Sequence, residues 1–600
     1  MPRNKGQQPL VFWMIALLLP LMFFGLMEAS LRVFGYGRDL PLFISNPAQP
    51  AYMLPRPDII QRYFSAHTKI PKVSLETNFF LKDKPQNGYR VFVQGGSTAA
   101  GFPYGLGASL AGMLDNRLKD SLPKQHVEVI NTAMSAVNSY TVLDFADEII
   151  SQQPDAILIY MGHNEYLGIL GVGSAYSGSF FNGSTLLFLK LRSLRLFQLL
   201  QDTYAYFQHN QGEDKTQPDN NRTLMATVAK YKNIPYGSAM YHAGLSQFET
   251  NLGLLLDKYA AAKIPVYLAT IASNVKDQKP FASDTPNTDF YPQTREISQL
   301  LETGESTQAT KLIKNIAQSQ PFQQNAEAQF ALANLHYVTG DFGEAGKLFD
   351  RAKDLDLLRF RAPEALNKII QKYSSRYDNV TLVDVQQRLK QSSKDGLIGH
   401  NLMLEHLHPN VQGYFLLADT FYQSLAKNSQ HMDWRTVSIQ QAWQARPIIP
   451  SEEYHGFAKI LQLKTDYPFT DTPIELALPP PQDWQQQLGQ QYFSKRIDWL
   501  TMMRRALAGY QNRKDEDMIL KTAQLLADAL PQDAQLNQMV ADLFRQKKRY
   551  HLAIHYYLRA QLSDSSSTKL HRSLIWTYQK NQQPDLVKIW RARLAQLTAD

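Results

Sequence analysis

The stretch "VFVQGGSTAAGFP", residues 91–103, decides how the central part of the chain folds. A run of β-branched and aromatic residues, typical of a buried strand, leads into two glycines and a serine. Because a helical segment follows near 107–121, we expect Gly95, Gly96 and Ser97 to form a sharp strand-to-helix turn. Such a turn exposes a serine hydroxyl and directs the first backbone N–H groups of the helix toward an anion. Ser97 is therefore a candidate nucleophile, although a Gly-Gly-Ser loop without a catalytic role would look the same.

Strand-like and helical segments alternate along the chain on both sides of this turn. The predicted strands are "YRVFVQG" (89–95), "HVEVINTA" (126–133), "DAILIYMG" (155–162), "IPVYLATI" (264–271) and "VTLVDV" (380–385). The predicted helices between them lie at 107–121, 139–152 and 241–262. This alternation predicts an α/β domain, residues 35–433, with a parallel sheet covered on both faces and ligands at the carboxyl ends of the strands.

Two stretches interrupt the alternation. Residues 170–240 are rich in Gly, Ser and Asn around a short apolar helix, and we expect an excursion or lid beside the sheet. Residues 292–362 are predicted to be all-helical and contain "LANLHYVTGDFGEAGKLFDRA". Its small and aromatic residues have the spacing of a tetratricopeptide repeat, in which two antiparallel helices pack closely.

The same pattern returns at the C-terminus, in "LNQMVADLFRQKKRYHLAIHYYLRA". We therefore predict a module of tetratricopeptide-like helical repeats over residues 486–600. Residues 434–485 are interpreted as its linker, with "LALPPPQDW" (476–484) as a stiff polyproline spacer. Because repeat modules present concave surfaces, this one is expected to bind a protein partner.

The N-terminus predicts a membrane anchor. Residues 9–27 are an uncharged apolar run long enough to cross a bilayer, and Arg3 and Lys5 precede it. A secretory signal peptide would have a shorter apolar core and a clear cleavage site, and a buried core helix is not expected at this position. We interpret residues 1–30 as a cytoplasmic tail and a single uncleaved transmembrane helix in the inner (cytoplasmic) membrane, with the remainder exported to the periplasmic side.

Composition excludes several classes of chemistry. The chain has 600 residues and no cysteine, so disulfides, thiolate zinc sites, iron–sulfur clusters and cysteine nucleophiles are excluded. The net charge of +8 is spread along the whole chain without a concentrated basic block, and no nucleic-acid partner is expected.

Two further motifs carry chemistry. "YMGHNEY", residues 160–166, puts Asn164 at the end of the third strand, where its amide could stabilise an oxyanion or merely tolerate a left-handed turn. "LMLEHLHPNVQGYFLLAD", residues 402–419, puts His408 three residues after Glu405. A carboxylate there can hold the imidazole in the tautomer that deprotonates a serine. A metal site involving His400 is the alternative for this segment, but no complete ligand set is evident, and we expect no metal.

The order of these blocks resembles the SGNH, or GDSL-like, hydrolase superfamily. The resemblance implies that "GGSTAAG" supplies the nucleophile Ser97, that Asn164 lies in the oxyanion hole, and that Glu405 and His408 complete the catalytic residues. Backbone N–H groups of Ser97 and Ala136 would complete the oxyanion hole. Ala136 stands where the family has glycine, and Glu405 where it has aspartate. The implied fold is a flavodoxin-like three-layer α/β/α sandwich.

The resemblance extends to a subgroup of membrane-anchored bacterial GDSL-like proteins with tetratricopeptide repeats. It covers about residues 80–430, and the quoted segments "GGSTAAGFPY", "YMGHNEY", "SNVKDQKPFAS" (273–283), "LRFRAPEALN" (358–367) and "EHLHPN" carry it. The segment "LRFRAPEALN" contains Arg359 and Arg361. These arginines either bind an anionic substrate group or pair with Asp354 and Asp356, and we favour the pairing.

The expected function is that of an exported, membrane-anchored serine esterase or acyltransferase that needs no cofactor. Its substrate would be an acyl ester, with the O-acetyl groups of a cell-envelope polysaccharide favoured by the expected location. The alternative is a non-catalytic repeat scaffold for envelope or polysaccharide-export assembly, with a relic SGNH domain. The substrate-binding residues are not evident from the sequence.

Overall fold

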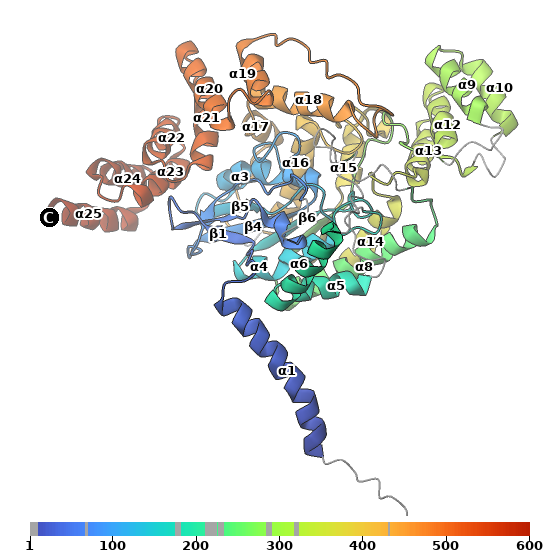
Figure 1. Ribbon diagram of the computed structural model, residues 1–600. Helices are drawn as coiled ribbons and strands as arrows, with labels where there is room; N and C mark the ends of the chain where they lie inside the picture. Colours follow the sequence, from blue (N-terminus) through green and yellow to red (C-terminus); the bar gives the residue numbers. More distant parts are fainter. Residues whose placement is uncertain are drawn as a thin grey trace, which may run out of the picture.

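The centre of the protein is a parallel sheet of five strands, as a computed structural model shows (Figure 1). The structure describes residues 10–65, 70–174, 182–210, 225, 233–283, 291–316, 323–429 and 432–599. The strands are β4 (Gly88–Gly95), β5 (His126–Asn131), β6 (Ala156–Tyr160), β7 (Val266–Ala269) and β8 (Val380–Val383). Their spatial order is β5-β4-β6-β7-β8, and every neighbouring pair is parallel. If the five strands are numbered 1 to 5 in the order of the chain, their spatial order is 2-1-3-4-5, which is the flavodoxin-like arrangement.

Helices cover both faces of this sheet, which confirms the predicted mixed α/β architecture. One face carries α3 (Leu110–Ser121), α15 (Val385–Ser392) and α16 (Val411–Asn428), and the other carries α4 (Ser139–Ser151), α8 (Ala239–Ala261) and α14 (Glu364–Ser374) (Figure 1). The short strand β6 has every side chain buried, as a strand covered on both faces requires.

The segment before the sheet, 35–85, forms a small antiparallel sheet of β1 (Phe43–Ser45), β2 (Tyr52–Pro55) and β3 (Phe80–Leu81). Phe43 and Phe80 pack edge-to-face against each other and against Phe92 of β4. The segment is therefore part of the hydrophobic core of the α/β domain.

The helical insertion consists of two hairpins. They are formed by α9 (Tyr291–Glu302) with α10 (Ser306–Ile316), and by α12 (Ala326–Val338) with α13 (Phe342–Leu355). Ala333, Ala345 and Phe349 are fully buried where α12 and α13 meet, because small residues allow a close helix crossing.

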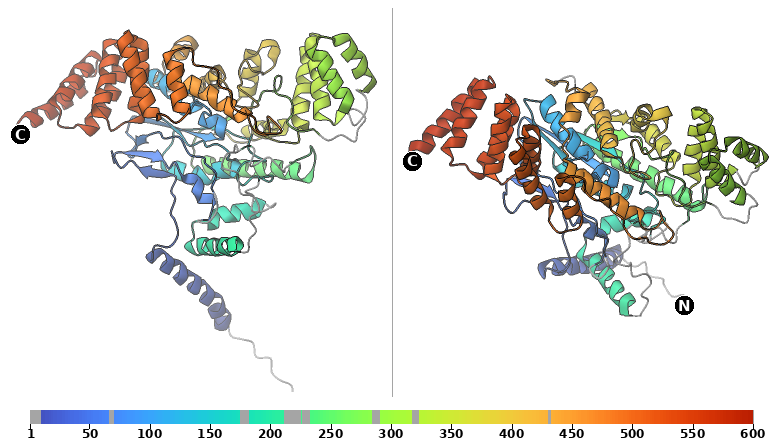
Figure 2. Two further views of the ribbon diagram at one scale, coloured as in Figure 1. Left: turned by 45° about the horizontal axis from the view of Figure 1, so that its top comes forward. Right: turned by 90° about the horizontal axis from the view of Figure 1, so that it is seen from above.

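The C-terminal region is an array of helices that extends away from the sheet (Figure 2). It comprises α19 (Trp484–Phe493), α20 (Trp499–Arg513), α21 (Glu516–Ala529), α22 (Ala534–Gln546), α23 (Tyr550–Ser563), α24 (Thr568–Lys580) and α25 (Pro584–Ala599). The array also contacts the α/β domain, since Asp120 of α3 pairs with Arg549 and with His551.

The predicted linker 434–485 is more structured than expected. It contains α17 (Ile439–Gln444) and α18 (Pro450–Lys464), and α18 packs against α19 as the first partner of the array. Ile449, just before α18, is buried in one apolar cluster with Leu488 of α19. We expected a linker because prolines and polar residues lie on both sides of α18. The apolar residues within α18 nevertheless have the spacing of a helix. Residues 473–481 have no helix or strand, in keeping with the proposed spacer.

At the N-terminus, α1 (Leu10–Val33) projects from the body of the protein (Figure 1). Its segment Phe12–Val33 has a mean hydropathy of 2.0 and is long and apolar enough to span a membrane, as some signal sequences also are. Arg3 and Lys5 lie outside the described residues. Of the expected excursion 170–240, the structure describes α5 (Asn182–Leu191) and α6 (Arg195–Asn210), whereas 175–181, 211–224 and 226–232 lie outside the described residues.

Candidate active site

Ser97 lies directly after the central strand, at the start of the short helix α2 (Ser97–Ala100). Gly95 is required before it, because a Cβ there would come within 2.0 Å of the Tyr160 carbonyl oxygen on β6. Gly101 ends α2 with φ 98°, a conformation that favours glycine. The predicted strand-to-helix turn is therefore confirmed, and its glycines bring Ser97 to the carboxyl edge of the sheet.

His408 reaches Ser97 from the segment before α16. Its Nε2 lies 2.8 Å from Ser97 Oγ, across 311 residues of sequence. The loop is held closed by the Leu404 N–H, which donates to the His408 carbonyl at 2.8 Å. It ends at Asn410, whose side chain caps α16 by accepting from the Gly413 N–H at 2.9 Å.

Glu405 lies on the other side of the imidazole and is completely buried. Its Oε1 contacts Nδ1 of His408 and also accepts the His408 backbone N–H at 3.0 Å. Its Oε2 accepts the Leu407 N–H at 3.3 Å. Phe102 packs on the His408 ring with 4.7 Å between ring centroids. The side chain of His408 is thus fixed by a carboxylate on one edge and an aromatic ring against its face.

The predicted oxyanion donors are the N–H groups of Ser97 and Ala136 and the Asn164 amide, and the structure shows the amide beside the turn that carries Ser97. A Cβ on Gly96 would be 3.1 Å from Nδ2 of Asn164, so the amide lies beside the residue before Ser97. Ala136 has φ 61°, and its carbonyl accepts the Ile169 N–H at 2.8 Å. Within the described residues, the N–H groups of Ser97 and Ala136 and the Asn164 amide donate to no protein acceptor.

Glu165 is a residue whose importance the sequence did not reveal. It is fully buried and accepts hydrogen bonds from the Ser139 N–H at 3.1 Å, the Ser139 hydroxyl at 2.7 Å and Gln247 Nε2 at 2.5 Å. Burial raises its pKa to about 7 despite these donors. Glu165 ties the turn that carries Asn164 to α4 and α8. The motif "YMGHNEY" contains this acid, but its partners Ser139 and Gln247 lie far away in the sequence.

Two further histidines are buried beside the candidate triad, and neither was expected. His406 contacts Oε2 of Glu405, and His163 accepts the Ala362 N–H at Nδ1 over 3.3 Å. Burial lowers the pKa of His163 and of His408 to about 3, because the charged form loses its hydration. His408 is therefore a neutral imidazole at neutral pH, the form that accepts a proton.

His400, the histidine of the metal alternative, has other partners in the structure. His400 Nδ1 lies 3.3 Å from the Asn274 amide, and its backbone N–H donates to Asp277 at 2.7 Å. Over the described residues, no group of three or more His, Asp or Glu side chains is arranged for a metal ion.

The two arginines of "RFRAP" have partners within the protein. Arg361 forms a buried ion pair with Asp356 at 3.0 Å. Arg359 donates at 2.8 Å to the carbonyl oxygens of Ile234 and Asp354. The expected pairing with Asp356 is confirmed, whereas Asp354 contributes its backbone rather than its carboxylate.

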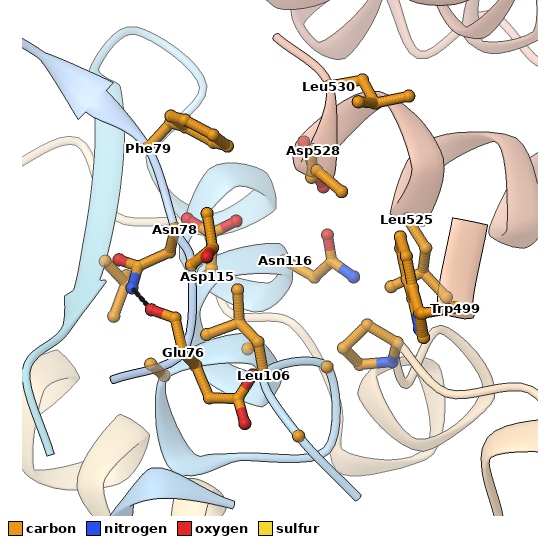
Figure 3. Close-up of a pocket in the computed structure, with 18 of the residues that line it drawn as sticks. Glu76, Asn78, Phe79, Leu106, Asp115, Asn116, Trp499, Leu525, Asp528 and Leu530 are labelled. Carbon is orange, nitrogen blue, oxygen red and sulfur yellow. Dashed lines mark hydrogen bonds between the residues drawn. The ribbon is translucent and has the colours of Figure 1, made fainter. Parts of the chain in front are cut away.

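A cavity of about 510 Å³ lies between the α/β domain and the helical array (Figure 3). Glu76, Asn78 and Asp115 line one side, and Trp499 and Asp528 face them from the array. The three triad residues do not line it. It is separated from them by the segment after α2, in which Pro103 and Tyr104 line the cavity and the preceding Phe102 packs on His408.

The arrangement of Ser97, His408 and Glu405 is that of a serine nucleophile with a general base and an orienting carboxylate. Neither a family model nor a curated protein matches the chain. Among solved structures, it is similar to one described as a "putative acylhydrolase" from Bacteroides fragilis, at 10% identity and a TM-score of 0.27. The similarity covers 58% of this chain and 90% of the other chain. A likeness at this level carries no argument about activity.

Proposed function

We propose that this protein is a membrane-anchored serine esterase or acyltransferase of the SGNH type that acts on acyl esters, O-acetyl esters among them. The observation that carries the proposal is the 2.8 Å contact between His408 Nε2 and Ser97 Oγ, with Glu405 against the opposite ring nitrogen. These three groups come from the two ends of the α/β domain, 311 residues apart for Ser97 and His408.

In the first half of the reaction, Ser97 Oγ attacks the acyl carbonyl carbon while His408 Nε2 accepts the hydroxyl proton. Glu405 keeps the proton of His408 on Nδ1 and stabilises the imidazolium that forms. The N–H groups of Ser97 and Ala136 and the Asn164 amide donate to the oxyanion. The C–O bond to the alcohol then breaks, and His408 returns the proton to the leaving oxygen.

In the second half, an acceptor hydroxyl attacks the acyl-serine and His408 again accepts its proton. Water as acceptor gives hydrolysis, whereas a sugar hydroxyl gives transfer. The same side chains serve both outcomes, so the proposal includes both. A cell-envelope polysaccharide is the substrate class that an exported, anchored enzyme would meet.

The substitution of Glu405 for the aspartate of the SGNH pattern is compatible with this role. Its longer side chain accepts the backbone N–H of His408 as well as contacting the ring, so the carboxylate has a fixed position. Ala136 in place of glycine keeps its backbone N–H, which is the group the reaction needs.

The proposal is tested with the full-length protein in detergent and a fluorophosphonate probe, which labels only an activated serine. We expect labelling of the wild type and its loss in Ser97→Ala and His408→Ala. Ser375→Ala is the matched control, because Ser375 is an exposed serine on the far end of α14. Turnover of an aryl acetate by the same four proteins should follow the same order. Absence of both labelling and turnover in the wild type would favour the scaffold alternative.

A further inference from the structure

The cavity between the α/β domain and the helical array has the size and the lining of a ligand site (Figure 3). Its volume of about 510 Å³ lies within the range of small-molecule sites, about 300–1,000 Å³. Glu76 and Thr77 line the cavity and are exposed, so a ligand can reach this side from solvent. None of the proposed catalytic steps uses this cavity.

Trp499, at the start of α20, supplies an aromatic ring to the lining. Its indole N–H donates to Oε1 of the buried Glu452 at 2.9 Å, and the other oxygen of Glu452 accepts the Ile449 N–H at 3.2 Å. The ring is therefore held by its polar edge. Figure 3 shows Phe79 on the opposite side of the cavity. Rings of this kind offer flat apolar faces against which the C–H groups of a ligand can pack.

Two side chains of the lining have polar atoms left without a partner among the described residues. The Glu76 carboxylate forms no hydrogen bond and no ion pair with them, and the Asn116 amide nitrogen donates to none of their acceptors. The Asn116 oxygen, in contrast, accepts from Gln524 Nε2 at 2.5 Å, which fixes the amide. A ligand hydroxyl donates to a carboxylate and accepts from an amide nitrogen, so a ligand rich in hydroxyl groups satisfies both side chains.

The charges around the cavity are balanced, which disfavours an ionic ligand. Ion pairs within the protein join Asp115 to Lys119 at 2.5 Å, Glu128 to Arg90 at 2.8 Å and Asp528 to Arg559 at 2.6 Å. Of the other acidic and basic side chains of the lining, Glu76 and Lys459 are opposite in sign. Burial raises the pKa of Glu452 to about 7, so this carboxyl is partly protonated near neutral pH. A neutral polar ligand therefore suits the site.

One wall of the cavity is shared with the candidate active site. Pro103 and Tyr104 line the cavity, and the preceding Phe102 packs on the His408 ring with 4.7 Å between ring centroids. Lys459, also in the lining, has its Nζ 5.3 Å from the centroid of the Phe102 ring. A ligand in the cavity is therefore separated from His408 by a single layer of side chains.

We propose that this cavity binds a neutral sugar unit of the polysaccharide whose acyl esters are the substrate. The sugar ring packs on Trp499, and its hydroxyl groups bond to Glu76 and Asn116. The site holds the polymer beside the triad and takes no part in the acyl transfer. The inference rests on the proposed function for the link between this sugar and the substrate ester, whereas the binding itself does not.

The test measures binding rather than turnover. The full-length protein, in a detergent without a sugar headgroup, is applied to a microarray of neutral and acidic bacterial oligosaccharides. The neutral oligosaccharide with the strongest signal is then titrated calorimetrically into the wild type, Glu76→Ala and Trp499→Ala. Because Glu76 is exposed and unpartnered among the described residues, its replacement removes no packing. Glu302→Ala at the end of α9 and Trp576→Ala in α24 are matched controls, because both side chains are exposed and line no part of this cavity.

We expect the wild type to bind at least one neutral oligosaccharide. Its Kd should rise by about tenfold or more in Glu76→Ala and in Trp499→Ala, as the loss of a hydrogen bond to a charged group or of an aromatic contact predicts, and stay within about twofold in both controls. No binding of any neutral oligosaccharide, retention of acidic ones alone, or an unchanged Kd in either cavity variant would overturn the proposal.

The same preparation separates this inference from the proposed function. Sugar binding by a protein that turns over no ester would contradict the esterase and leave the sugar site standing. Esterase activity without sugar binding would do the reverse, and the cavity would then be a solvent-filled seam between the α/β domain and the array.

Discussion

Glu405 holds His408 at two points, because the same carboxylate oxygen accepts the histidine's backbone N–H at 3.0 Å and contacts Nδ1 of its ring. The ring is therefore oriented relative to its own main chain, and its Nε2 faces Ser97 without help from a bound substrate. A carboxylate on a separate strand or loop would need two segments to stay in register. Here a single loop contains both groups.

Glu405→Gln should lower kcat for an aryl acetate by about 10⁴, because an amide favours the wrong tautomer of the imidazole while keeping the geometry. Glu405→Asp should lower kcat less, because it keeps the charge but shortens the reach to Nδ1. Steady-state kinetics of both variants, with circular dichroism to confirm folding, checks this. Activity of Glu405→Gln within tenfold of the wild type would show that Glu405 does not orient the base.

Asn164→Ala should lower kcat by about 10²–10³ with little change in KM, because an oxyanion donor acts on the transition state rather than on the bound ester. Asn428→Ala is a suitable control, since Asn428 is exposed at the end of α16, where its amide donates to the Thr381 hydroxyl. A rise in KM at constant kcat would instead assign Asn164 to substrate binding.

As the pH is lowered, kcat/KM should begin to fall only well below the usual histidine pKa of about 6.5. Burial lowers the pKa of His408 to about 3, so the neutral base persists as the pH falls. We expect kcat/KM to fall less than twofold between pH 7.5 and pH 5.5. A histidine with the usual pKa of about 6.5 would lose about tenfold between pH 7.5 and pH 5.5, and such a loss here would contradict the prediction.

The sheet and the triad segments could be predicted from the sequence because their signals are local. The strand β6 is a continuous apolar run, and Ser97 stands between glycines whose roles are set by contacts within a few residues of the turn or on the adjacent strand. The resemblance of the block order to the SGNH superfamily then predicted that Glu405 and His408 lie beside Ser97, and the 2.8 Å contact between His408 Nε2 and Ser97 Oγ agrees with it.

What the sequence could not predict depends on contacts between distant segments. Glu165 accepts hydrogen bonds from Ser139 and Gln247, which lie 26 and 82 residues away in the sequence. The cavity in Figure 3 is formed where α3 meets the helical array, more than 400 residues later in the chain. Helix α18 was missed because turn-forming residues surround it, and tertiary packing on α19 outweighs those local signals.

Ala136→Gly should raise the free energy of unfolding by about 1 kcal/mol. Ala136 has φ 61°, and this left-handed conformation is strained for a residue with a Cβ but not for glycine. Its backbone N–H is unchanged, so kcat should stay within about twofold. Thermal unfolding and aryl acetate turnover of the same preparation test both parts. A large loss of kcat with higher stability would show that the Ala136 methyl group shapes the acyl pocket.

Glu165→Gln should make the protein more stable than the wild type above pH 7 and equally stable near pH 4. Burial raises the pKa of folded Glu165 to about 7 from the usual 4.5, so the folded state holds its proton more tightly than the unfolded state. This stabilising contribution is complete below pH 4.5 and is lost as the pH rises through 7. Over the pKa difference between 4.5 and about 7, at about 1.4 kcal/mol per unit, the loss is about 3.5 kcal/mol.

Glutamine resembles the protonated acid and keeps an oxygen for the Ser139 donors, so the variant lacks this pH dependence. The difference in melting temperature between variant and wild type, measured in detergent at pH 4, 5.5, 7 and 8, should grow between pH 4 and pH 7 and level off above pH 7. Glu249→Gln is the control, because its carboxylate forms only a surface pair with Lys372 at 2.6 Å. A difference for Glu165→Gln that is constant with pH would show that Glu165 is ionised in the folded protein throughout this range.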